Sequence, residues 1–348
     1  MSIPLLKKMR ALWPDHKLAL VCRKGLGDFF LKTKLVDQLF EVEKGSSESY
    51  ARVLQQLQIE EVDYLISPHE SVRTAFFCAR IKAQVKVSFK HNWNFWCYSK
   101  RTKKNKNLPD ALRQLSLLEF FDSQLRDNLT RYLQHEKPFA TSAFGRLSKV
   151  PSWASMSIRN EINSAVDSHQ AIEKKFGLRG FEDGKSVLLF PGSVWETKKW
   201  TEEGYIAVGN HLQKLGYNIY VMGGPGEESL SDKIAEKIQG GRSLAGKTKL
   251  IESAQLIAKA ALVIGNDSAS THLAAVCETP VIAVFGPTIL EFGFRPWSSE
   301  SYIVQNERIK CRPCGKHGHQ TCPIKTHECM TSISAEEVVT TARHILGY

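Results

Sequence analysis

The feature that most constrains this chain is a series of short apolar runs in its second half, each followed by a polar loop. The runs in "SVLLFPGS", "YNIYVMGG", "ALVIGNDS" and "PVIAVFGPT" read as buried strands that end in glycine, hydroxyl or acidic residues. Between them, stretches such as "TEEGYIAVGNHLQKLG" and "ESLSDKIAEKI" carry apolar residues at helical spacing. Strands that alternate with helices in this way predict a doubly wound, parallel α/β sheet.

The first half shows a similar alternation. "KLALVC" predicts a strand, "RKGLGD" a glycine turn, and "FFLKTKLVDQLF" a helix over residues 29–40. Helices and strands then alternate up to residue 89, and regularity lapses between 91 and 107. The predicted class is α/β with two doubly wound Rossmann-like domains.

The domain bounds follow from these patterns. A length of 348 residues with 42% apolar content suits two domains better than one. A last helix is expected after Ser334, because Ser334 and Glu337 form a capping box. Packing of this helix back on the first domain is left open. The predicted segments are 1–175, 176–333 with a cysteine-rich loop at 311–329, and the helix 334–348.

Charge is concentrated in the first half. The net charge is +11, and residues 1–170 contribute 27 Lys and Arg against 17 Asp and Glu. This imbalance predicts an anionic partner, for which nucleic acid, a phosphorylated glycolipid and a membrane surface are the options. The chain has no run of eighteen apolar residues and no apolar core near its start, so we expect a cytoplasmic protein.

The stretch "IGNDSASTHLAA" places polar residues where a buried strand ends and a helix begins. The free N–H groups and the dipole of such a helix favour phosphate binding near Asp267 and Ser268. The structural alternative is that these residues only cap the helix while His272 faces the core. Similar loops follow the other strands, and together they predict a site for a nucleotide diphosphate. These loops supply Ser193, Lys198, Lys199, Gly223, Glu227 and Thr288.

These segments resemble glycosyltransferase family 9, the lipopolysaccharide heptosyltransferases. The resemblance rests on "FPGSVWETKKW", "YVMGGPGEE", "RKGLGDFFLKTKLVDQL" and the stretch from "SLAGKTKL" to "VFGPT". It implies a GT-B fold whose two domains face a cleft, an ADP-heptose donor on the second domain and an acceptor on the first. It also implies inversion at the anomeric carbon, with no cofactor or metal required for catalysis. Ala269 departs from the family pattern, which usually has glycine there.

The resemblance also assigns roles. Asp28 is the expected general base, with helix capping as the structural alternative. Lys198 is the expected phosphate contact, with Lys199 as the fallback and a solvated surface charge as the alternative for both. Asp267 is expected to orient backbone amides or His272 rather than to meet phosphate itself, and Glu227 to hold the ribose. The expected nucleotide contacts are Ser193, Lys199, Gly223, Glu227, Asp267, Ser268, Ala269, His272 and Thr288.

A basic stretch, "SKRTKKNKN", follows the aromatic residues Trp93, Phe95, Trp96 and Tyr98. Aromatic and basic residues alternate in this way in proteins that bind single-stranded nucleic acid. A phosphorylated lipid A-core acceptor at the cytoplasmic face of the inner membrane makes similar demands, and the resemblance favours it, so no nucleic acid is expected. A solvated loop is the structural alternative. The expected acceptor contacts are Lys24, Arg101, Lys103 and Lys104.

Four cysteines crowd into "CRPCGKHGHQTCPIKTHEC". Two cysteines at CxxC spacing with two more downstream are typical of a structural zinc site. Free thiols and a disulfide stay open as alternatives. The candidate zinc ligands are Cys311, Cys314, Cys322 and Cys329.

The sequence thus predicts an inverting, metal-independent heptosyltransferase. Two other functions are alternatives to this prediction. One is a GT-B transferase that uses another nucleotide sugar. The other is a non-catalytic protein that binds a nucleotide sugar or nucleic acid. This alternative is favoured if Ala269 marks a site that has lost its activity.

Overall fold

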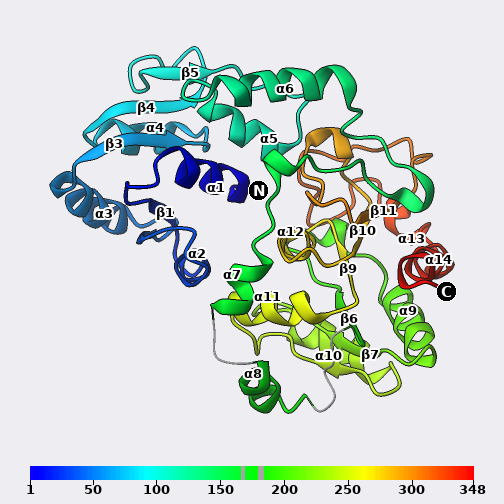
Figure 1. Cartoon of the computed structure of the whole chain (residues 1–348). Helices are drawn as coiled ribbons and strands as arrows, with labels where there is room; N and C mark the ends of the chain where they lie inside the picture. The colour runs from blue at the N-terminus through cyan, green and yellow to red at the C-terminus, as the bar shows by residue number, and fades with distance from the viewer. Residues whose placement is uncertain (166–168, 179–183) are drawn as a thin grey trace. The chain divides into compact units, whose positions relative to one another are not determined.

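A computed structural model describes residues 1–165, 169–178 and 184–348 of the chain. Within these ranges the chain forms two compact units, Met1–Glu136 and Lys137–Tyr348, and each is described by itself. Figure 1 shows that both units combine helices with short strands. None of the described helices is long and apolar enough to cross a bilayer.

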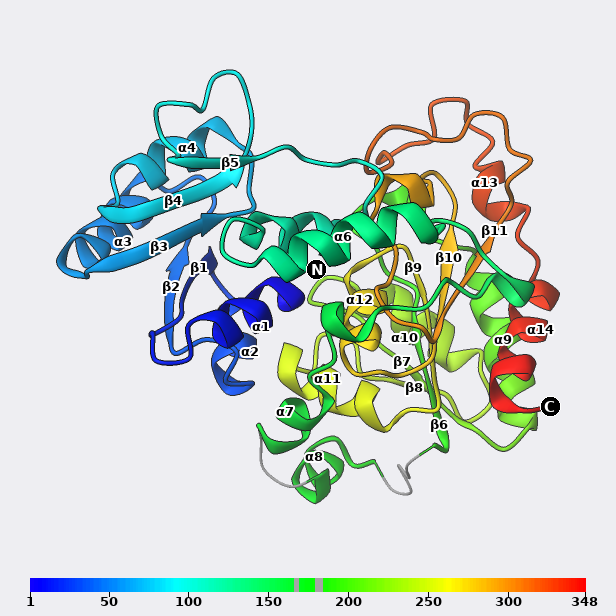
Figure 2. The same ribbon diagram turned by 45° about the horizontal axis from the view of Figure 1, so that its top comes forward.

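The strands of the first unit form two small parallel sheets. Strand β1 pairs with β2, and β3, β4 and β5 form the other sheet in that order. Figure 2 shows the three strands of the larger sheet side by side. The strands are β1 (Ala19–Arg23), β2 (Gln38–Val42), β3 (Val62–Ser67), β4 (Ala83–Phe89) and β5 (Lys100–Thr102).

Side-chain caps begin three helices of the first unit. The hydroxyls of Ser46 and Ser71 and the carboxylate of Asp122 each accept a hydrogen bond from the backbone N–H three residues on, which satisfies a donor of the first helical turn. The helices are α1 (Ile3–Leu12), α2 (Gly27–Lys32), α3 (Ser47–Ile59), α4 (Val72–Ala79), α5 (Asp110–Leu115) and α6 (Ser123–His135).

The predicted helix over residues 29–40 is wrong in its second half. Helix α2 ends at Lys32, and β2 begins at Gln38. Lys34 has a φ of 55°, a left-handed conformation that a continuous helix excludes. Phe40 is then buried against helices α3 and α4. Burial in a tertiary core, rather than local spacing, therefore decides the structure of this segment.

The second unit has the predicted doubly wound sheet. Its order is β11-β10-β9-β6-β7-β8, and all pairs are parallel. Side chains of β9 and β10 are buried along their whole length, as their continuous apolar runs require. The strands are β6 (Ser186–Phe190), β7 (Asn218–Val221), β8 (Arg242–Ser243), β9 (Leu262–Asn266), β10 (Val281–Phe285) and β11 (Ser301–Gln305).

The helices of the second unit include all those predicted between residues 201 and 277. They are α7 (Arg159–Ser164), α8 (His169–Phe176), α9 (Glu202–Lys214), α10 (Glu228–Glu236), α11 (Leu250–Lys259), α12 (Ala269–Val276), α13 (Glu328–Thr331) and α14 (Ala335–Leu346).

The units divide between Glu136 and Lys137, whereas the sequence predicts a boundary near residue 175. Leu147 is buried in a cluster with β10 and β11. The indole N–H of Trp297 donates to the backbone oxygen of Ala154 at 2.8 Å, across 143 positions of sequence. Long-range contacts of this kind leave no local pattern, so the sequence assigns this segment to the wrong unit.

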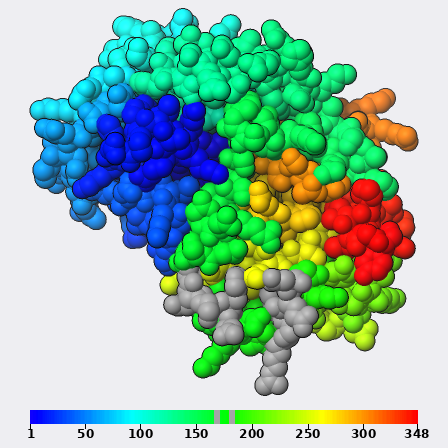
Figure 3. Space-filling model, viewed as in Figure 1, coloured from blue at the N-terminus to red at the C-terminus, as the bar shows by residue number. Residues whose placement is uncertain are grey.

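Helix α14 belongs to the second unit, whereas the sequence left packing on the first domain as an option. It packs against α9, β10 and β11 and buries Val338, Val339 and Ala342. The capping box of Ser334 and Glu337 is confirmed at its start. Figure 3 shows the helix, in red, on the surface of the molecule.

Candidate active site

The order of the second sheet fixes one edge as a ligand site. From β6 the chain moves outward to β7 and β8, and it then returns to the other side of β6 to form β9, β10 and β11. The loop after β6 leads to one side of the sheet and the loop after β9 leads to the other. The two loops therefore diverge at the carboxyl edge of these neighbouring strands. Doubly wound sheets bind ligands at such a switch point. Lys198 follows β6, Asp267 follows β9, and Thr288 follows the neighbouring strand β10.

These three side chains meet at one carboxylate. Nζ of Lys198 lies 2.5 Å from Oδ2 of Asp267, and 3.3 Å from the backbone oxygen of the same residue. The hydroxyl of Thr288 donates to the same Oδ2 at 2.6 Å. All three side chains are buried, where charge interactions are less screened than in water. Asp267 thus holds Lys198 and Thr288, whereas the sequence expects it to orient amides or His272.

Asn266 is a residue that the sequence analysis missed. It is fully buried, and its Oδ1 accepts hydrogen bonds from the backbone N–H of Trp200 and the hydroxyl of Tyr205, both at 3.0 Å. Its amide donates to the backbone oxygen of Pro191 at 2.8 Å. Asn266 therefore ties the end of β9 to the loop that carries Lys198. An amide at the end of an apolar strand, next to an acid, was the available signal.

Helix α12 starts directly after this cluster. Ser268 is its N-cap residue but makes no side-chain capping bond, and its hydroxyl lies 2.9 Å from that of Ser270. The capping alternative is therefore not what the structure shows for Ser268. Ala269, the first helical residue, is exposed. The N–H groups of this first turn lie beyond the reach of the helix's own carbonyls and can meet an anion.

His272 lies one turn into the same helix. Its Nδ1 is buried and has no hydrogen-bond partner among the residues that the structure describes. The pKa of His272 is lowered to about 4, mainly by burial; Asp267 raises it and Lys198 lowers it, both by smaller amounts. The imidazole is therefore neutral at physiological pH. A neutral ring can act as a hydrogen-bond donor or acceptor, but not as a counter-charge for phosphate.

Glu227 connects the loops after β6 and β7. Its Oε2 accepts a hydrogen bond from the N–H of Gly224 at 2.8 Å. A Cβ atom on Gly192 would lie 2.1 Å from Oε1 of Glu227, so only glycine lets the carboxylate approach this loop. Gly223 also lies against Glu227. The carboxylate is half-buried at the carboxyl edge of the sheet, where a hydroxyl-bearing ligand could meet it.

The other two candidate site residues of the loop after β6, Ser193 and Lys199, make contacts within that loop. Ser193 is half-buried, and its hydroxyl accepts a hydrogen bond from the N–H of Trp195 at 3.3 Å. Lys199 pairs with Glu196 at 2.5 Å. It therefore does not share the carboxylate that holds Lys198. Of the two candidate lysines, the structure brings only Lys198 into the cluster around Asp267.

The first unit carries Asp28 at the start of α2. The N-cap of this helix is Leu26, so Asp28 lies in the first turn and does not cap it. Its carboxylate pairs with Lys32 at 2.9 Å, and the Asp28 side chain is 61% exposed. Glu41, which the sequence analysis did not single out, accepts hydrogen bonds from the N–H groups of Gly25 and Gly27 at 2.9 and 3.3 Å. Glu41 therefore fixes the glycine turn that presents Asp28.

The four expected acceptor contacts have different surroundings. Lys24 pairs with Glu43 at 2.6 Å, and Lys104 pairs with Glu70. Arg101 lies in β5 and donates to the backbone oxygen of His91 at 3.4 Å, while Lys103 is exposed. Three of the four basic groups are therefore already engaged by the protein.

The cysteine-rich loop (residues 311–329) is tied to the loop that carries Lys198. The backbone N–H of Thr197 donates to the oxygen of His319 at 3.1 Å, and the N–H of His319 donates back to the Thr197 hydroxyl at 2.8 Å. Nε2 of His327 lies 2.9 Å from the backbone oxygen of Thr197. A Cβ atom on Gly318, which has a φ of 81°, would lie 2.8 Å from the Thr197 hydroxyl oxygen.

The same loop also holds the segment after β10. The guanidinium of Arg312 donates to the backbone oxygen of Thr288 at 2.7 Å, and the N–H of Cys314 donates to that of Pro287 at the same distance. The cysteine-rich loop therefore braces two of the three loops that meet at Asp267.

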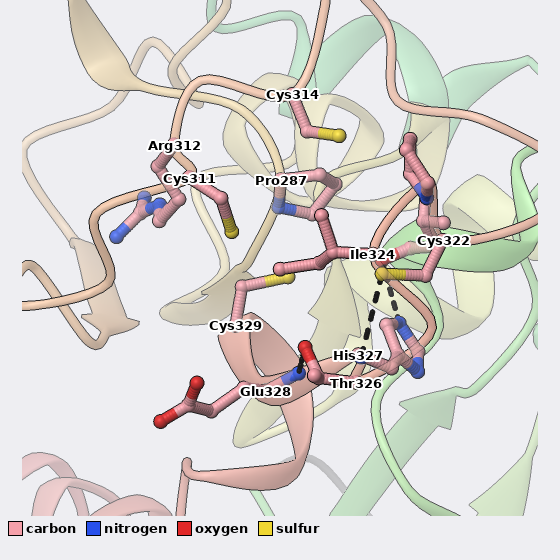
Figure 4. A pocket seen from close by; sticks show the side chains of 12 residues that line it. Pro287, Cys311, Arg312, Cys314, Cys322, Ile324, Thr326, His327, Glu328 and Cys329 are labelled. Atoms are coloured by element: carbon pink, nitrogen blue, oxygen red, sulfur yellow. Dashed lines mark hydrogen bonds between the residues drawn. The ribbon is translucent and has the colours of Figure 1, made fainter.

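All four cysteines of this loop line one pocket. Figure 4 shows their sulfur atoms around it, with the side chain of Ile324 between them in this view. The N–H of His327 donates to the sulfur of Cys322 at 3.4 Å. All four are free thiols, so the disulfide alternative is not what the structure shows. Within residues 1–165, 169–178 and 184–348, no three His, Cys, Asp or Glu side chains are grouped to hold a metal ion.

Solved structures share this fold. An E. coli ADP-heptose lipopolysaccharide heptosyltransferase II matches with a TM-score of 0.71 at 17% identity, over 99% of this chain and 94% of the other. An E. coli heptosyltransferase solved with ADP matches with a TM-score of 0.69 at 17% identity, over 99% of this chain and 95% of the other. The α/β fold is therefore of the GT-B class, as the sequence predicts.

Sequence comparison gives the family. Lipooligosaccharide heptosyltransferase 2 of Campylobacter jejuni is 31% identical over 171 residues, which are 47% of this chain and 52% of that protein. The chain therefore spans about half the length of this curated relative. The pattern of glycosyltransferase family 9 (heptosyltransferase) matches residues 50–325. This match covers most of the sequence, and the chain belongs to glycosyltransferase family 9.

Proposed function

We propose that this chain moves heptose from ADP-heptose to the inner core of lipopolysaccharide, with inversion at the anomeric carbon and without a catalytic metal ion. Family membership supports sugar transfer. The observation that carries the proposal is the buried cluster of Lys198, Asp267 and Thr288 at the switch point of the second sheet. One E. coli protein of this fold is named for ADP-heptose and another was solved with ADP, which supports adenosine diphosphate as the carrier.

The donor diphosphate would lie between Lys198 and the start of α12. Lys198 supplies a cation, and the first N–H groups of the helix supply uncharged donors. Ser193 and Ser268 add hydroxyls on either side, and the half-buried carboxylate of Glu227 can accept hydrogen bonds from the ribose hydroxyls. Ala269 is exposed at the first helical position, so its methyl group lies on the side of α12 where the diphosphate would bind.

Transfer would proceed in one displacement. The carboxylate of Asp28 takes the proton of the acceptor hydroxyl, whose oxygen bonds to the anomeric carbon from the face opposite the diphosphate. The bond from that carbon to the diphosphate oxygen breaks, and its electron pair leaves with ADP. Lys198 and the α12 amides offset the charge that develops on the leaving group. The high exposure of Asp28 supports this role, because a base must reach a bound hydroxyl.

The acceptor would be a phosphorylated lipid A-core that the first unit meets at the cytoplasmic membrane face. Arg101 lies on β5 and Lys103 directly follows it. Lys24 and Lys104 would exchange their carboxylate partners for acceptor phosphates. No nucleic acid is expected as a partner.

A thermal-shift panel tests the donor. ADP, UDP, GDP and CDP, each alone and as sugar conjugates, are added to the full chain, because a ligand of the native state raises its melting temperature. We expect a shift selective for ADP and ADP-heptose. Mass spectrometry of a core acceptor that lacks the heptose should then show a mass increase of one heptose. Selectivity for another nucleotide would overturn the donor, and no shift with any ligand would favour a non-catalytic protein.

The structural zinc stays a prediction. The four thiols line one pocket, but in the described residues they do not form a ready ligand group. Metal analysis of protein purified without chelators separates the options. One zinc per chain would support the site, and its absence would leave free thiols.

A further inference from the structure

Four of the exposed large apolar side chains of the first unit come from α4 and from the segment between β4 and β5. Phe95 is 67% exposed, Phe76 55%, Val72 53% and Trp96 48%. The rings of Phe76 and Trp96 are in contact, with centroids 5.2 Å apart. Exposed apolar residues are common singly, but contiguous patches mark interaction sites. We call these four residues the aromatic face.

Buried residues next to the aromatic face hold it in place. Cys97 and Tyr98, next to Trp96 in sequence, are buried in the core cluster that contains Phe77. The Cys97 thiol donates to the backbone oxygen of Ala75, on α4, at 3.2 Å. The aromatic face therefore presents Phe95 and Trp96 on a segment anchored by buried neighbours.

The chain segment that carries the aromatic face has charges of one sign. Residues 71–109 contain ten Lys and Arg and no Asp or Glu. Arg73 lies on α4 three residues before Phe76, and Arg80, the C-cap residue of this helix, lies four residues after it, so both are on the side of Phe76. Both are exposed. The apolar rings are therefore flanked by cations on the same surface.

We propose that the aromatic face seats the first unit on the surface of an anionic bilayer. Phe76, Phe95 and Trp96 would enter the headgroup region, where aromatic rings are favoured, while Arg73 and Arg80 meet lipid phosphates. Binding would be peripheral, because none of the described helices can cross a bilayer. The inference fits the proposed function, since a lipid-linked acceptor lies at such a surface, but its test needs no sugar transfer.

Vesicle sedimentation tests the proposal on the full chain. Vesicles of phosphatidylcholine alone are compared with equal parts of phosphatidylcholine and phosphatidylglycerol. We expect binding to the anionic vesicles, and a loss of roughly tenfold or more in partitioning for Phe95→Ser/Trp96→Ser, because two rings no longer leave water on binding. Ile59→Ser is the matched control, since Ile59 is 87% exposed in the same unit but lies at the end of α3.

The electrostatic part has its own variants. Arg73→Glu/Arg80→Glu should lose binding to anionic vesicles, whereas Arg52→Glu on α3 should keep most of it. Equal binding by the aromatic double variant and the wild type would overturn the proposal. So would wild-type protein that binds single-stranded oligonucleotide but not vesicles. ADP-induced thermal shifts of the variants separate this outcome from failure of the proposed function, because unchanged shifts show an intact nucleotide site.

Discussion

Nζ of Lys198 lies 2.5 Å from Oδ2 of Asp267 in a site where the two side chains are only 11% and 6% exposed. A buried pair gains little over an apolar pair of the same volume, because both charges lose hydration. Removing one partner is different, since the other charge is then left buried and uncompensated. We therefore expect the pair to serve ligand binding. We also expect the loss of either side chain to destabilise the fold, because the other charge is then unpaired.

Asp267→Asn should lower the free energy of unfolding by about 3 kcal/mol, because it leaves the Lys198 ammonium buried without a counter-charge. Urea denaturation measures the loss. The double variant Lys198→Met/Asp267→Leu should recover most of it. A single variant as stable as the wild type would show that water or rearrangement already compensates the lysine.

Lys198→Ala should weaken ADP binding by about 2 kcal/mol, or roughly thirtyfold, because a charged hydrogen bond to the diphosphate is lost. Lys199→Ala is the matched control, since its ammonium pairs with Glu196 and not with Asp267. Isothermal titration calorimetry with ADP gives both affinities. Equal losses in the two variants would contradict the assignment of Lys198.

Asp28→Ala should reduce turnover roughly 10²- to 10⁴-fold and leave ADP affinity unchanged, because a general base acts on the acceptor and not on the nucleotide. Glu48→Ala is a close control: Glu48 also lies in the first turn of a helix and pairs with a cation four residues on, Arg52. Initial rates with ADP-heptose and a core acceptor compare the two. Near-normal turnover in Asp28→Ala would remove it as the base.

His327→Ala should weaken ADP binding by about 1 kcal/mol, roughly fivefold, because the loop that carries Lys198 loses one hydrogen bond from the cysteine-rich loop. His327→Gln can still donate to the Thr197 oxygen and should restore most of the affinity. Calorimetry at a temperature where both variants are folded makes the comparison. If both variants bind ADP like the wild type, the cysteine-rich loop does not position Lys198.

Stability should rise between about pH 4 and pH 6.5 through His272. Its folded pKa is lowered to about 4, so the unfolded chain binds more protons in this window and protonation opposes folding. The contribution is fully present above the unfolded pKa and is lost as the pH falls towards 4. Urea midpoints of wild type and His272→Gln should converge, or cross, at the acid end. A constant difference between them across the window would contradict this assignment.

The second sheet could be predicted from the sequence because its strands are continuous apolar runs that each end in a polar loop. Lys198, Asp267 and Thr288 were predicted for the same reason, since parallel strands bring their carboxyl ends together. Their contacts could not be predicted. That Thr288 donates to Asp267, and that Asn266 joins β9 to the β6 loop, depends on distances between loops that are remote in sequence.

The first unit was harder to predict. The residues of β2 have helical spacing, and their burial against α3 and α4 decides their conformation. The segment around Leu147 belongs to the second unit because of partners more than a hundred positions away. Glu41 was missed because a lone acid in a strand gives no sign that it holds the glycine turn before Asp28.

The close approach of Glu227 to Gly192 also restricts how this site can evolve. A side chain at position 192 would collide with the carboxylate, so that position is closed to substitution while Glu227 keeps its place. Shortening Glu227 removes the collision and opens position 192 to change. The two positions are therefore coupled: a residue other than glycine at 192 turns the Glu227 carboxylate away, and the hydrogen bond from the Gly224 N–H is lost with it.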